Sequence, residues 1–182
     1  MNLNNKMECF MLTEKDYKLL FDEKIKELEQ SLHKMKEGVN CAELTLTNIL
    51  DILGLHNGVY NNMMIPLAGG LGGYKSQKGW MGACGTMVGG CAAIGVILGG
   101  KERMDNDLIP IAYLKAAKFA SEFENELGSV VCSDLCGVSF SDPNGYIEYR
   151  QNNIWSKTCC IFIFWAIDEV RKLTRKQLKK KW

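Results

Sequence analysis

The stretch WMGACGTMVGGCAAIGVILGG, from Trp80 to Gly100, decides how the rest of this sequence folds. It carries no charge and consists largely of glycine, alanine, cysteine and aliphatic residues. On a helix, a step of seven residues is almost two turns, so Cys84 and Cys91 would lie on one stripe and face the same neighbour. Each glycine costs about 1 kcal/mol of helix propensity relative to alanine. We therefore expect the glycines to admit a closely packed neighbouring backbone.

Two other interpretations of this stretch are weaker. Its 21 uncharged residues are long enough to cross a bilayer, but most are small, which is typical of a buried helix at the centre of a bundle. The segment from Gly95 to Lys101 has the spacing of a P-loop. However, Glu102 stands where Ser or Thr would bind magnesium, and the preceding segment has a helical pattern. We predict neither a membrane span nor a nucleotide site.

Helical patterns also occupy most of the remaining chain. A capping box at Thr13–Asp16 precedes apolar residues spaced by three and four up to Met35. Asn40 can cap a helix that Gly54 ends, and further helical segments follow Asp105 and Ser156. We predict an all-α fold: one domain, residues 1–182, formed by a helical bundle of about five to seven helices around the glycine-rich central helix. Its core spans about 13–175, with residues 1–12 and 176–182 peripheral.

Composition and charge fit one globular domain. The 182 residues are 47% hydrophobic and 24% charged, with a net charge of +1. Seven of the last 12 residues are Lys or Arg, while the rest of the chain is acidic. Lysines are favourable at the negative end of a helix dipole. We interpret the basic tail as a solvated helix end and expect no nucleic-acid partner.

Cysteine usage points to metal or redox chemistry. The chain has eight cysteines and two histidines, and no apolar run precedes Thr13. Without an export signal we expect a cytoplasmic protein, in a reducing compartment where clustered thiols bind metals or undergo redox reactions. With few histidines, a metal site would be mostly thiolate, which favours iron–sulfur or zinc.

The candidate thiols are distributed over four predicted helices: Cys41, Cys84 or Cys91, Cys132 with Cys136, and Cys159 or Cys160. Cys41 lies in a first turn, where the helix dipole lowers a thiol's pKa. Cys132 and Cys136 are four residues apart and share a helix face. Adjacent residues point about 100° apart on a helix, so only one of the last pair can join a given cluster. A bundle could bring one thiol from each helix to a common point.

The order and spacing of these motifs resemble the C_GCAxxG_C_C family of redox-active proteins, from about residue 15 to residue 175. The resemblance rests on GVNCAE at 38–43, AGGLGG at 68–73, CGTMVG at 84–89, Cys132 before Leu135 and Gly137, and Cys159 before Ile163 and Ala166. That family also resembles the cysteine-bearing part of split-Soret cytochrome c. The resemblance implies a mostly helical fold and an electron-transfer or iron–sulfur role.

Carried over by position, the family's four cysteines are Cys41, Cys84, Cys132 and Cys159. Thr86 replaces the signature alanine, and a second literal match, GCAAIG at 90–95, contains Cys91. Cys91, Cys136 and Cys160 therefore remain rivals for these places.

The leading functional hypothesis is an electron-transfer protein that binds an iron–sulfur cluster through cysteine thiolates. The alternatives are a thiol–disulfide oxidoreductase with a close cysteine pair and a structural zinc protein. We expect no haem, because no C-x-x-C-H motif occurs. No general acid or base stands out. A redox partner protein is expected, and a homodimer is left open.

Overall fold

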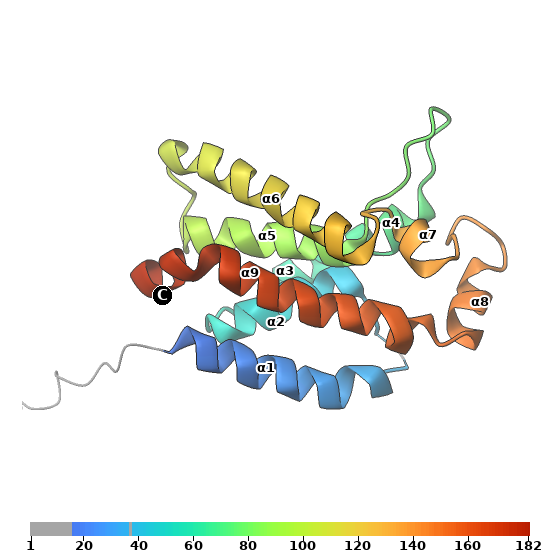
Figure 1. Cartoon of the computed structure of the whole chain (residues 1–182), viewed down its shortest axis with the longest axis horizontal. Coiled ribbons are helices and arrows are strands. Elements are labelled where there is room, and N and C mark those ends of the chain that lie inside the picture. The colour runs from blue at the N-terminus through green and yellow to red at the C-terminus, as the bar shows by residue number, and fades with distance from the viewer. Residues whose placement is uncertain (1–15, 37) are drawn as a thin grey trace, which may run out of the picture.

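The computed structural model describes residues 16–36 and 38–182, and within them it is helical without a strand (Figure 1). The longer helices are α1 (Tyr17–Ser31), α2 (Cys41–Ile52), α3 (Gly58–Met64), α5 (Gly85–Gly99), α6 (Ile109–Leu127), α8 (Gly145–Gln151) and α9 (Cys160–Lys181). The shorter elements are η2 (Leu32–Lys34), η3 (Ile65–Leu67), α4 (Ala68–Gly73), η4 (Asn106–Leu108), α7 (Cys132–Cys136) and the π-helical turn η5 (Trp155–Cys159). The all-α prediction is confirmed.

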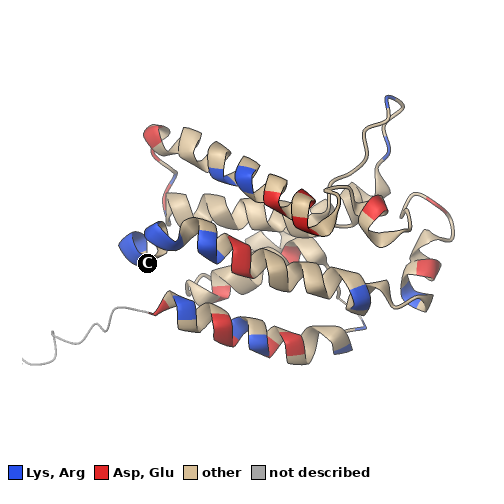
Figure 2. Cartoon of the chain, in the orientation of Figure 1, with Lys and Arg blue, Asp and Glu red and all other residues tan. Residues whose placement is uncertain are grey.

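Helix α5 is the central element. It packs against α2, α6 and α9, while α1 packs on the outer side of α9 and α2 (Figure 1). Charged side chains lie on the surrounding helices and are absent from α5 (Figure 2). Ala93, Ile94 and Ile97 of α5 are completely buried. The prediction of a glycine-rich central helix is therefore confirmed.

The central helix is shorter than the sequence predicts, because it begins at Gly85 and not at Trp80. Trp80 is 51% exposed and lies between α4 and α5 in the sequence. The segment that joins these two helices projects from the end of the bundle (Figure 1). Gly82 packs directly against Gly70, which is twelve residues earlier in the sequence. A Cβ at position 82 would lie 1.8 Å from the carbonyl oxygen of Gly70. The N–H of Gly82 donates to the carbonyl of Tyr74, and the carbonyl of Gly82 accepts from the backbone N–H of Cys132. These hydrogen bonds keep residues 81–83 extended, so Cys84 becomes the residue that precedes α5.

Helices α2, α5 and α9 run in the same direction and begin at the same end of the bundle (Figure 1). That end lies away from the C-terminus and also carries α4, α7 and α8. The N-terminus of a helix carries a partial positive charge and unpaired N–H groups. The N-termini of α2 and α5, and the start of η5, which continues into α9, therefore direct a positive potential at one region of the fold.

The basic C-terminal turn closes the opposite end of α5. Leu178 is buried, the Lys181 ammonium donates to the carbonyl of Leu98, and the Trp182 indole N–H donates to the carbonyl of Ile97 at 3.1 Å. These carbonyls are among the last of α5, which lack a partner within the helix. Residues 176–182 thus cover part of the bundle, unlike the peripheral tail expected. Residues 1–12 and the Thr13–Lys15 part of the capping box lie outside the described residues; Asp16 caps α1.

Glycines on one side of α5 bring α2 unusually close. A Cβ on Gly85 would lie 2.6 Å from the sulfur of Cys41, and one on Gly89 would lie 2.5 Å from the carbonyl oxygen of Ala42. By contrast, a Cβ on Gly95 would meet no atom within 4 Å. The glycines near the start of α5 are therefore needed for packing, whereas Gly95 is not.

No described helix is long and apolar enough to cross a membrane.

This difference gives a matched pair of variants. Gly89→Ala should lower the free energy of unfolding by about 2 kcal/mol or more, because the new methyl group collides with the α2 backbone. Gly95→Ala should raise it by up to about 1 kcal/mol, because alanine favours the helix and finds open space. Urea denaturation measures both. Equal effects of the two variants would contradict the packing described.

Candidate functional site

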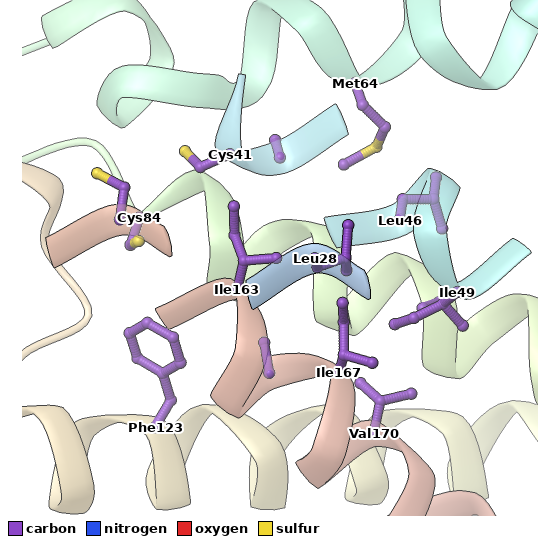
Figure 3. Close-up of a cluster of buried hydrophobic side chains, with 14 of the residues drawn as sticks. Leu28, Cys41, Leu46, Ile49, Met64, Cys84, Phe123, Ile163, Ile167 and Val170 are labelled. Atoms are coloured by element: carbon purple, nitrogen blue, oxygen red, sulfur yellow. The ribbon is translucent and has the colours of Figure 1, made fainter. Parts of the chain in front are cut away.

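Five cysteines gather at the end of the bundle where α2, α5 and α9 begin. They lie at the start of α2 (Cys41), before α5 (Cys84), at both ends of α7 (Cys132 and Cys136), and at the end of η5 (Cys159). All except Cys136 are buried. Figure 3 shows the side chains of Cys41 and Cys84 next to each other at an edge of the hydrophobic core. The other three thiols and Cys41 line one cavity of about 450 Å³.

Cys136 and Cys159 are in contact, with their Sγ atoms 3.9 Å apart. Cys136 also hydrogen-bonds Cys132 on the same face of α7. The hydroxyl of Tyr149, on α8, donates to the sulfur of Cys159 at 3.3 Å. Cys136 therefore links Cys132 to Cys159, and the weak C-x-x-x-C signal in the sequence corresponds to two thiols of one site.

The π-helical turn η5 places Cys159. The indole N–H of Trp155 donates to the carbonyl of Leu32 at 2.8 Å, and the hydroxyl of Ser156 donates to the carbonyl of His33 at 2.9 Å. These two bonds fix the turn to η2, which follows α1. Single π-helical turns are frequent at functional sites. Cys159 lines the cavity, whereas Cys160 is completely buried and lies outside its lining.

The glycine-rich segment at 69–73 forms a left-handed turn beside the thiols. Gly69, Gly70, Leu71 and Gly72 all have φ between 56° and 67°. Only glycine adopts this conformation at little cost, so the segment is left-handed because three of these four residues are glycine. A Cβ on Gly70 would lie 3.0 Å from the Cβ of Cys132. The turn thus packs directly against the site, and its Gly69 backbone hydrogen-bonds Cys41.

Cys91 does not belong to this site, so the predicted stripe of Cys84 and Cys91 is wrong. The sulfur of Cys91 lies 3.8 Å from the sulfur of Met87 and 3.9 Å from the carbonyl oxygen of Ala116 in α6. The physical reason is the later start of α5. Cys84 precedes the helix with an extended ψ of 129°, so the seven-residue helical step does not apply to it.

Burial and the repulsion between neighbouring negative charges both disfavour the ionisation of several thiols of the site at the same time. Burial raises the pKa of Cys41, and the neighbouring thiols raise it further, while the Gly69 backbone lowers it. Burial likewise raises the pKa of Cys84 to about 12, against hydrogen bonds from the backbones of Met87 and Thr86. Such a group is stable only if the sulfurs keep their protons, share a cation or form a disulfide.

The three hydrogen-bonded thiols, Cys132, Cys136 and Cys159, differ in pKa. Hydrogen bonds to Cys132 and Cys159 strongly raise the pKa of Cys136, which therefore keeps its proton. The bond from Cys136 lowers the pKa of Cys132 and is the largest cause of the lowered pKa of Cys159, to which Tyr149 also contributes. The thiolate character of the site is concentrated on Cys132 and Cys159.

Neither histidine belongs to the site. The His33 ring packs edge-on against Phe164, and the Nδ1 of His56 lies 2.9 Å from a carboxylate oxygen of Asp51.

Within residues 16–36 and 38–182, no three or more His, Cys, Asp or Glu side chains have the arrangement that holds a metal ion. The buried hydroxyl of Thr86, which replaces the signature alanine, has no hydrogen-bond partner.

The unequal pKa values predict that thiols inside the site react before thiols outside it in the reduced, metal-free protein. At pH 8, iodoacetamide should modify Cys159 ahead of Cys91 and Cys160, because burial raises their pKa values to about 11 and about 12 and leaves them almost wholly protonated. Tyr149→Phe removes a donor to the Cys159 sulfur, so that thiol's pKa rises and its modification slows. Peptide mass spectrometry measures each rate. Faster labelling of Cys91 than of Cys159 would contradict this electrostatic description.

Comparisons with known proteins agree with the geometry. The model of the C_GCAxxG_C_C family, described as "Putative redox-active protein", matches residues 39–173. The matched segment contains all five cysteines of the site. Comparison with curated proteins gave no match, nor did comparison with solved structures. Because the family model covers most of the chain and every thiol of the site, this protein belongs to the C_GCAxxG_C_C family of redox-active proteins.

Proposed function

We propose that the protein transfers electrons through an iron–sulfur cluster held by Cys41, Cys84, Cys132 and Cys159. The observation that carries this proposal is the meeting of thiols from four separate segments of the chain at one end of the bundle. Each of these four cysteines is less than 9% exposed. Four thiolates are the usual ligands of such clusters, and the cluster supplies one-electron transfer when it is bound.

The surroundings of the sulfurs support an anionic thiolate centre. The backbones of Gly69, Thr86 and Met87 hydrogen-bond the sulfurs of Cys41 and Cys84. Hydrogen bonds to sulfur tune the reduction potential of iron–sulfur centres. Three helix N-termini add positive potential. A bound cation would also relieve the repulsion that raises the pKa of Cys41.

Anaerobic reconstitution with iron and sulfide tests the proposal. The wild-type protein should become coloured and retain iron and sulfide, and serine variants of Cys41, Cys84, Cys132 and Cys159 should each lose at least about half of the bound iron, because a ligand is missing. Visible absorption and metal analysis measure this. A structural zinc site, which four thiolates also suit, would instead give zinc without colour or sulfide.

Two variants of cysteines outside the site serve as controls. Cys91→Ser changes a thiol that faces α6, and Cys160→Ala changes one that is buried in the core. Both should bind as much iron as the wild type. The proposal fails if the wild type stays colourless and free of iron, or if the control variants lose iron as readily as the four ligand variants.

A second candidate function is thiol–disulfide exchange between Cys136 and Cys159. Their sulfurs are 3.9 Å apart, and a disulfide bond of about 2.05 Å needs them to approach by roughly 2 Å. Cys159 has the lowered pKa that suits an attacking thiolate. Forming the bond releases two protons and passes two electrons to the disulfide of an oxidised dithiol partner, which becomes two thiols.

Thiol counting tests this second function. Mild oxidation of the metal-free protein by diamide should remove two free thiols per chain, and peptide mapping should find Cys136 joined to Cys159. Cys136→Ser should lose this bond, whereas Cys91→Ser should keep it. An unchanged thiol count in the wild type would exclude the exchange reaction while leaving the iron–sulfur proposal intact.

A further inference from the structure

The cavity at the thiols extends well beyond the sulfur atoms. Its volume is about 450 Å³, within the range of sites for small organic molecules. Away from the cysteines its walls are aromatic, formed by Phe140, Tyr146, Tyr149 and Trp155. A second cavity of about 300 Å³ shares the last three of these residues but contains no cysteine. We call the space with the thiols the inner chamber and the space without a cysteine the outer chamber.

The charged side chains that line these chambers are cations. Within residues 16–36 and 38–182, the lining of both chambers includes Lys36 and Arg150 and no Asp or Glu. The N-terminus of α2 also meets the inner chamber, through Asn40 and Cys41. Low-dielectric walls strengthen such a potential. An anion is therefore the favoured occupant.

Two of the neutral donors in the walls, Trp155 and Tyr149, already have partners. The indole N–H of Trp155 donates to the carbonyl of Leu32, and the hydroxyl of Tyr149 donates to the sulfur of Cys159. What these two residues still offer is their ring surface. The guanidinium of Arg150 lies over one face of the Tyr146 ring, 6.0 Å from its centre, so the cation is adjacent to an aromatic wall of the cavity. Recognition would rest on charge and stacking.

We propose that this cavity binds a small organic anion with a flat unsaturated body. Its anionic group would lie against Arg150 and Lys36, and its body would lie between the aromatic side chains and extend toward the thiols. Seated there it would reach the sulfur centre. Its role as electron donor or acceptor of that centre rests on the proposed function, whereas the binding itself does not.

A pair of probes with the same ring system, one anionic and one neutral, tests the proposal. Titration calorimetry on the reduced, metal-free protein should show one 2-naphthoate bound per chain, and neutral 2-naphthamide should bind at least about tenfold more weakly. Bound naphthoate should also protect Cys159, which lines the cavity, from iodoacetamide. Absence of naphthoate binding at 10 mM, or equal affinity for the two probes, would overturn the proposal.

Matched variants locate the binding. Arg150→Gln should weaken naphthoate binding about tenfold and leave naphthamide binding unchanged. Lys157→Gln removes an exposed cation from η5 that lines neither chamber, and should have no effect. Equal losses in both variants would mean that general charge, and not this cavity, attracts the probe. A protein that binds naphthoate but takes up no iron would refute the iron–sulfur proposal alone.

Discussion

The close approach of α5 to α2 is the contact on which the site depends. Gly85 and Gly89 have no Cβ at this contact, so the sulfur of Cys41 and the carbonyl of Ala42 lie where Cβ atoms would otherwise be. This contact sets Cys41 beside Cys84 at the edge of the core (Figure 3). The helix propensity lost at these glycines is offset by the packing that they permit.

Around this contact, the fold combines groups that favour negative charge with groups that resist it. The N-termini of α2, of α5 and of the continuous helix formed by η5 and α9, together with the backbone of the left-handed turn at α4, favour anionic sulfur. Burial and the proximity of five thiols oppose it. A buried group of thiols under these opposing influences gains most from a change of charge or oxidation state, which is consistent with the redox-active family to which the chain belongs.

Local patterns in the sequence predicted the all-α fold and the central helix, because a charge-free run of small residues suits a buried helix whatever surrounds it. Contacts between segments that are distant in the sequence could not be predicted. The start of α5 depends on Gly82 meeting Gly70, and the place of Cys136 depends on how α7 docks beside η5. Nothing near Cys136 in the sequence shows that Cys159 lies next to it.

The central claim is that sulfur atoms from separate segments of the chain form one redox centre. X-ray absorption spectroscopy at the iron edge of the anaerobically reconstituted protein tests it most directly. Our account predicts that every ligand atom bonded to iron is sulfur, and that this signal is lost when Cys41 and Cys84 are both replaced by serine. Iron with nitrogen or oxygen neighbours in the wild type, or a signal that survives the double replacement, would contradict it.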